Sequence, residues 1–111
     1  MSPVTQYTVE ELAERHKAGE TPHVLDVRNP DELALAAVAN TINIPMPSIA
    51  ERLGELDEYK DQELIVMCHH GARSQRVAEY LASQGFTNVK NLTGGIHAWS
   101  LKVDPTVPTY N

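Results

Sequence analysis

Cys68, the only cysteine of the chain, lies between a short apolar segment and a segment with helical periodicity. Residues 64–67 are wholly apolar and include two β-branched residues, which favours a strand buried on both faces. From Ser74 onward, apolar residues follow the spacing of one helix face. A thiol placed between such a strand and helix faces the positive end of the helix and its unpaired N–H groups. Both favour the thiolate, which is the nucleophilic form of cysteine.

The residues that follow Cys68 are suited to hold an anion. Gly71 allows the loop to curl so that successive backbone amides point inward, as in an anion-binding nest. Arg73 adds a permanent positive charge. Residues 64–78 contain no carboxylate, although the chain as a whole has 15 acidic and 9 basic residues. The segment therefore predicts a pocket that stabilises a sulfur anion and receives an anionic substrate.

Two adjacent histidines, His69 and His70, are expected at the rim of this pocket. Either adds positive charge below about pH 6.5, and neither is required as a general base if the thiol is already ionised. A metal site formed by Cys68, His69 and His70 is an alternative. Adjacent residues rarely converge on one ion, and there is no second ligand pair at Cys-x-x-Cys or His-x-x-x-His spacing, so no metal is expected.

Four ordered motifs extend over most of the chain. Residues 68–74 read Cys-x-x-Gly-x-Arg-Ser, and residues 24–30 contain an Asp-x-Arg motif. Residues 43–45 read Asn-Ile-Pro, and residues 91–99 end in Gly-Gly-x-x-Ala-Trp, whose glycines permit a close approach or a positive φ. Together these motifs resemble those of the rhodanese family of sulfurtransferases. The resemblance extends over about residues 7–99 and implies a reactive Cys68, where a lone cysteine is otherwise usually an inert core residue.

The resemblance implies an enzyme of the thiosulfate sulfurtransferase type, which forms a persulfide on Cys68 and needs no cofactor. A small anionic sulfur donor would be bound by the loop, namely by His69, His70, Gly71, Ala72, Arg73 and Ser74. A thiol or a protein would accept the sulfur. In the family, the arginine matching Arg28 commonly lies near the substrate. Asp26 lies in an apolar strand and needs a partner, so it is expected to hold loop amides or an arginine in or near the active-site loop.

The other elements must form the sheet that positions Cys68. Capping boxes at residues 8–11 and 48–51 indicate two helix starts. The patterns predict strands at 23–28, 41–44, 64–67 and 87–92, and helices at 8–18, 30–38, 48–56, 74–84 and 96–101. Alternation of strands and helices implies an α/β fold. With the resemblance, it predicts a rhodanese-like, mostly parallel sheet of about five strands flanked by helices on both faces.

Length and composition limit the remaining possibilities. The 111 residues predict a single rhodanese domain, with a core of about residues 7–101 and an extended, proline-rich tail at 102–111. The net charge of −6 argues against a nucleic-acid partner. No apolar run approaches the roughly 18 residues of a membrane span. The N-terminal residues lack a signal-peptide pattern, so a cytoplasmic location is expected.

Two other functions are compatible with the same loop. A phosphatase or an arsenate reductase also uses a thiolate, a nest and an arginine. However, four residues separate Cys68 from Arg73, one fewer than in the related dual-specificity phosphatases, which favours the smaller terminal sulfur. The second alternative is a sulfur carrier or partner-binding module without significant thiosulfate turnover. Residues 103–110 resemble the tails of rhodanese-like domains attached to adenylating enzymes. The sequence leaves the physiological donor and acceptor and the oligomeric state open.

Overall fold

The structure, a computed structural model, describes residues 4–111. Residues 1–3, which begin the segment searched for a signal peptide, lie outside this description. The described strands are β1 (Thr5–Tyr7), β2 (His23–Asp26), β3 (Ile42–Asn43), β4 (Glu63–Met67) and β5 (Asn88–Leu92). They form one sheet in the order β1-β5-β4-β2-β3, and every neighbouring pair is parallel. The predicted α/β class is confirmed.

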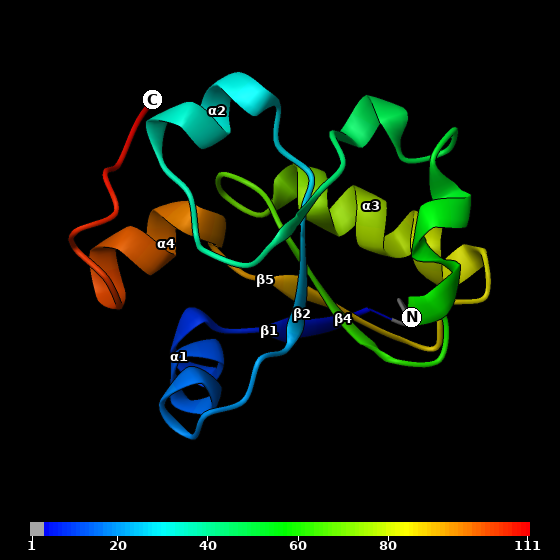
Figure 1. Cartoon of the computed structure of the whole chain (residues 1–111), viewed down its shortest axis with the longest axis horizontal. Helices are drawn as coiled ribbons and strands as arrows, with labels where there is room; N and C mark the ends of the chain where they lie inside the picture. Colours follow the sequence, from blue (N-terminus) through cyan, green and yellow to red (C-terminus); the bar gives the residue numbers. More distant parts are fainter. Residues whose placement is uncertain (1–3) are drawn as a thin grey trace.

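Helices cover both faces of this sheet (Figure 1). The α-helices are α1 (Val9–Lys17), α2 (Pro30–Leu35), α3 (Ala72–Ser83) and α4 (Gly95–Lys102), and two 3₁₀ helices are η1 (Met46–Ser48) and η2 (Leu53–Tyr59). The central strand β4 sends alternate side chains to opposite faces. Leu64 and Val66 pack in the cluster that contains Val77 of α3. Ile65 packs in the other cluster, with Trp99 of α4 and residues of α1.

The elements around the Cys68 loop follow the sequence prediction closely. Strand β4 ends at Met67. Helix α3 ends just before Gly85, and Gly85 itself has the left-handed conformation, with φ 97°. Phe86 is buried in the core. At the start of α1, the Thr8 side chain accepts a hydrogen bond from the Glu11 amide at 3.1 Å, so the predicted N-cap is confirmed. The Glu11 carboxylate accepts from the Thr8 hydroxyl at 3.2 Å, so the contact between these two side chains differs from that of a capping box. The strand and this N-cap carry strong local signals.

Two predictions about local structure are wrong, and one strand was missed. Helix α2 ends at Leu35, because Ala36 is extended (φ −160°, ψ 139°), so the helix does not reach residue 38. Ser48 does not open an α-helix; it ends the 3₁₀ helix η1, where Pro45 before the helix and Pro47 within it supply no backbone donors. The 3₁₀ helix η2 follows in place of the predicted α-helix. The edge strand β1 was not predicted, since three residues are too few to show a period.

The end of the chain returns to the sheet's carboxyl edge. Figure 1 shows the C-terminus beside α2, and Val107 and Tyr110 pack against the buried cluster of α1 and α4. Among the helices of residues 4–111, none is long and apolar enough to cross a membrane.

Candidate active site

Cys68 lies where β4 ends and α3 begins. The Gly71 amide donates a hydrogen bond to Cys68 Sγ at 3.0 Å. Gly71 has φ 112° and caps α3, a conformation that a residue with a side chain rarely adopts. The sulfur therefore lies at the positive end of a helix, which stabilises negative charge on it. The side chain is 1% exposed, so the groups around it close it off from solvent.

A chain of polar side chains connects the sulfur to the edge strand β1. Ser74 Oγ lies 3.3 Å from Cys68 Sγ and donates to Asn91 Oδ1 at 2.5 Å. Asn91 Nδ2 in turn donates to Gln6 Oε1 at 3.0 Å. Each of these side chains is positioned by a different element: α3, β5 and β1. The sequence analysis identified Ser74 but not Asn91 or Gln6, because only the strand order places β5 and β1 beside the loop.

Helix α4 holds the backbone of the loop from the other side. The amides of Ile96 and His97 donate to the carbonyls of Cys68 and His69 at 2.9 and 3.0 Å. A Cβ atom on Gly95, which has φ 57°, would lie 2.3 Å from the Cys68 carbonyl oxygen. The close approach expected of the Gly-Gly motif is thus confirmed, and it fixes the loop that carries the cysteine.

Arg73 is bound by a carboxylate that the sequence analysis did not identify. Its guanidinium donates to both oxygens of Glu32, at 2.6 and 2.8 Å. The Tyr110 hydroxyl donates to Glu32 Oε2 at 2.7 Å and accepts from Arg28 Nη1 at 3.0 Å. The hydrogen bond from Arg73 lowers the pKa of Glu32 to about 2, against the effect of burial. The same pair raises the pKa of Arg73.

Asp26 and Arg28 form a buried ion pair. The Arg28 amide, Nε and Nη2 all donate to the Asp26 carboxylate, with 2.7 Å between Nη2 and Oδ2. Burial opposes the charge on Arg28, but the Asp26 hydrogen bond raises its pKa above the usual value. Asn43 Nδ2 donates to the carbonyls of both residues.

Asp26 therefore holds an arginine, as predicted, but that arginine lies in the segment just after β2. This partner lies near the Cys68 loop rather than in it, since Arg28 Nη1 donates to the Tyr110 hydroxyl at 3.0 Å and the Tyr110 ring stacks on His69. The Arg28 side chain is 0% exposed, and its contact with a substrate remains a prediction.

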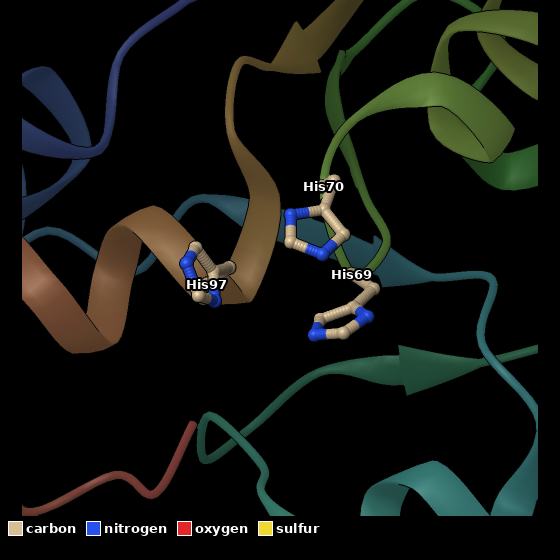
Figure 2. Close-up of side chains that lie close together, drawn as sticks. All are labelled: His69, His70 and His97. Atoms are coloured by element: carbon tan, nitrogen blue, oxygen red, sulfur yellow. The ribbon is translucent and has the colours of Figure 1, made fainter. Parts of the chain in front are cut away.

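Three imidazoles gather beside the loop (Figure 2). The His69 ring stacks on the Tyr110 ring, with 3.8 Å between centroids and 3° between planes. His70 is exposed, its ring centroid 4.0 Å from that of His69 and 4.7 Å from that of His97. Burial, followed by the neighbouring His70, lowers the pKa of His69. His70 is thus exposed beside the loop, whereas His69 is buried beneath Tyr110, and the place of both at the rim of a substrate pocket stays a prediction. His97 was not predicted.

Known proteins share both the sequence and the fold. A family model described as Rhodanese-like domain matches residues 8–102. A sulfurtransferase of Allochromatium vinosum is 35% identical over 97 residues, covering 87% of this chain and 89% of that protein. A crystal structure of a rhodanese-related protein from Thermoplasma volcanium is 35% identical with a TM-score of 0.79, covering 96% of this chain and 99% of that one.

Several of the similar proteins are much longer than this chain. The Rhodanese-like/PpiC domain-containing protein 12, chloroplastic, of Arabidopsis thaliana is 38% identical over 121 residues, which cover 97% of this chain. This chain spans only 38% of that relative's length.

Proposed function

Because the chain belongs to the rhodanese-like domain family of sulfurtransferases, we propose that it transfers sulfane sulfur from thiosulfate, or a similar anionic donor, through a persulfide on Cys68. The observation that carries this proposal is the hydrogen bond from the Gly71 amide to Cys68 Sγ at the start of α3. An amide at a helix N-terminus favours a sulfur anion both before the reaction and in the product persulfide.

In the first step, the Cys68 thiolate attacks the outer sulfur of thiosulfate. A new sulfur–sulfur bond forms at Cys68, and the bond within thiosulfate breaks, with its electron pair leaving on sulfite. The product is a negatively charged persulfide next to the same amide donors. This is covalent catalysis, because the enzyme holds the transferred group between two half-reactions.

In the second step, a thiophilic acceptor such as cyanide or a thiolate attacks the outer persulfide sulfur. The acceptor–sulfur bond forms, the sulfur–sulfur bond at Cys68 breaks, and its electron pair restores the thiolate. No net oxidation takes place, so no redox cofactor is needed. Two successive half-reactions of this kind give ping-pong kinetics.

The donor anion is bound by the loop amides of Gly71 and Ala72, by Ser74 and by Arg73, with the exposed His70 at the entrance and His69 beneath Tyr110. Donor binding must displace groups that now cover the site, because Cys68 is 1% exposed. Arg73 gives up its two hydrogen bonds to Glu32 and forms hydrogen bonds to the donor instead. Arg28 is available to an anion only after the Tyr110 hydroxyl leaves it.

The first test is intact mass after incubation with thiosulfate, together with thiocyanate production when cyanide is added. The wild type should gain one sulfur atom, lose it on addition of cyanide and turn over. Cys68→Ser should show neither effect while remaining folded by circular dichroism.

Arg73→Lys tests donor binding, because lysine cannot form two parallel hydrogen bonds. It should raise the KM for thiosulfate roughly tenfold, equivalent to about 1.4 kcal/mol. Arg52→Lys is the matched control, since the Arg52 side chain is 40% exposed and its ion pair among residues 4–111 is with the neighbouring Glu55 at the surface.

The two outcomes of the mass experiment separate the alternatives. A sulfur gain without turnover in the presence of cyanide or thiols would favour the sulfur-carrier function. No sulfur gain by a folded wild-type protein would refute thiosulfate transfer.

A further inference from the structure

Two separate segments bring three imidazoles to one place, next to the Cys68 loop. His69 and His70 come from the loop itself, and His97 comes from the first turn of α4 (Figure 2). One ring nitrogen of each residue lies within 4.8 Å of the other two. This distance is short enough for three ligands of one ion after small side-chain rotations.

Backbone contacts hold the two segments together. The His97 amide donates to the His69 carbonyl at 3.0 Å, and the Ile96 amide donates to the Cys68 carbonyl at 2.9 Å. Gly95 allows this approach, because any Cβ there would collide with both carbonyls. The three histidines are therefore gathered by the fold of the main chain rather than by a chance orientation of surface side chains.

Two of the imidazoles present buried nitrogens with no partner. His69 Nε2 and His97 Nδ1 are inaccessible to solvent and form no hydrogen bond within the described part of the chain. His69 is 9% exposed. A buried polar atom without a partner costs about 1–3 kcal/mol, so such atoms call for an explanation. A bound ion would supply the missing partner for both.

The environment of His69 resembles that of a metal ligand. The His69 ring is held by stacking on the Tyr110 ring, with 3.8 Å between the ring centroids. A ring fixed in this way keeps the unpartnered Nε2 in position for an ion.

We propose that His69, His70 and His97 bind one divalent transition-metal ion of the zinc class, with a fourth position open. Three imidazoles are a ligand set for such ions, whereas calcium and magnesium require oxygen. Zn–N bonds of about 2.1 Å place the nitrogens of a tetrahedral site about 3.4 Å apart, so the cluster contracts on binding. The exposed His70 ring is free to make most of this movement.

Cys68 is not a ligand of this site. Its sulfur is directed to the Gly71 amide and Ser74 Oγ, and it does not belong to the group of converging nitrogens. The site therefore differs from the Cys68–His69–His70 arrangement that the sequence suggested as an alternative, because a histidine 27 positions beyond His70 replaces the cysteine.

The test is titration of the metal-free, untagged protein with Zn²⁺ by calorimetry and with Co²⁺ by absorption spectroscopy. We expect one ion per chain and visible Co²⁺ bands without a sulfur-to-cobalt charge-transfer band. His97→Gln and His70→Gln should each weaken Zn²⁺ binding at least about tenfold. His70 is exposed, so its variant keeps the inference testable even if His97→Gln fails to fold.

His23→Gln is the matched control, because it removes an exposed imidazole on β2 outside the cluster and should leave Zn²⁺ affinity unchanged. Cys68→Ser should also bind Zn²⁺ with unchanged affinity and give the same Co²⁺ spectrum. The inference is overturned if Zn²⁺ does not bind, if His70→Gln binds Zn²⁺ as tightly as the wild type, or if binding is lost in Cys68→Ser. None of these readouts depends on sulfur transfer.

Discussion

Replacement of Glu32 by glutamine removes the charge that joins α2, α3 and the end of the chain. The Glu32 carboxylate accepts two hydrogen bonds from Arg73 and one from Tyr110. These contacts lower its pKa from 4.5 to about 2, with the Arg73 hydrogen bond as the main cause. At 1.36 kcal/mol for each pKa unit, the carboxylate contributes about 3 kcal/mol to stability at neutral pH.

The sign of the pH dependence follows from this lowered pKa. In the unfolded chain Glu32 takes up its proton near pH 4.5, whereas in the folded protein it does so near pH 2. Its contribution is therefore complete above about pH 5 and is lost as the pH falls from 4.5 to 2. Arg73 and Arg28 stay charged and Tyr110 stays neutral in this range. His69 is present in the wild type and in Glu32→Gln, so its own titration largely cancels in the difference between their free energies of unfolding.

Glutamine keeps the shape and one acceptor oxygen, worth about 1 kcal/mol. We therefore expect Glu32→Gln to be less stable than wild type by about 2 kcal/mol at pH 7, and by less than about 1 kcal/mol at pH 3. Urea unfolding followed by circular dichroism at both pH values measures this difference. Glu51→Gln, at an exposed position, should change the free energy of unfolding by less than about 0.5 kcal/mol. An equal loss at pH 7 and pH 3 would refute the electrostatic account.

Three further substitutions test the packing around the loop by urea unfolding at pH 7. Gly95→Ala should lower the free energy of unfolding by at least about 2 kcal/mol, because its Cβ would collide with loop carbonyls. In the control Gly54→Ala, the added Cβ meets nothing within 4 Å, so the loss should be less than about 1 kcal/mol. Equal losses in the two variants would contradict the close approach at Gly95. Ser74→Ala leaves the buried Asn91 oxygen without its donor and should lose about 1–3 kcal/mol; no loss would mean that water replaces the hydroxyl. Tyr110→Phe removes a hydroxyl that bridges an arginine and a carboxylate and should lose about 1–2 kcal/mol, and unchanged stability would show that the bridge is not formed in solution.

The sequence by itself determined the elements whose signals are local. The apolar residues 64–67 and the helical spacing after Ser74 placed Cys68 between a buried strand and a helix, and the structure has both elements there. The Gly94–Gly95 pair indicated a close approach, which α4 makes. Local signals failed where the segments were short, as in β1, or where proline removed the backbone donors of a helix, as around Ser48.

Only the tertiary structure decided which distant side chains share the site. Glu32 reaches Arg73 across 41 positions, and Tyr110 reaches Glu32 across 78. His97 joins the loop histidines because α4 begins directly against the loop backbone. None of these side chains belongs to a periodic pattern that marks its partner. Their proximity depends on the order of the parallel strands, which brings the carboxyl ends of the strands to one edge of the sheet. The spacing of residues along the sequence does not reveal this order.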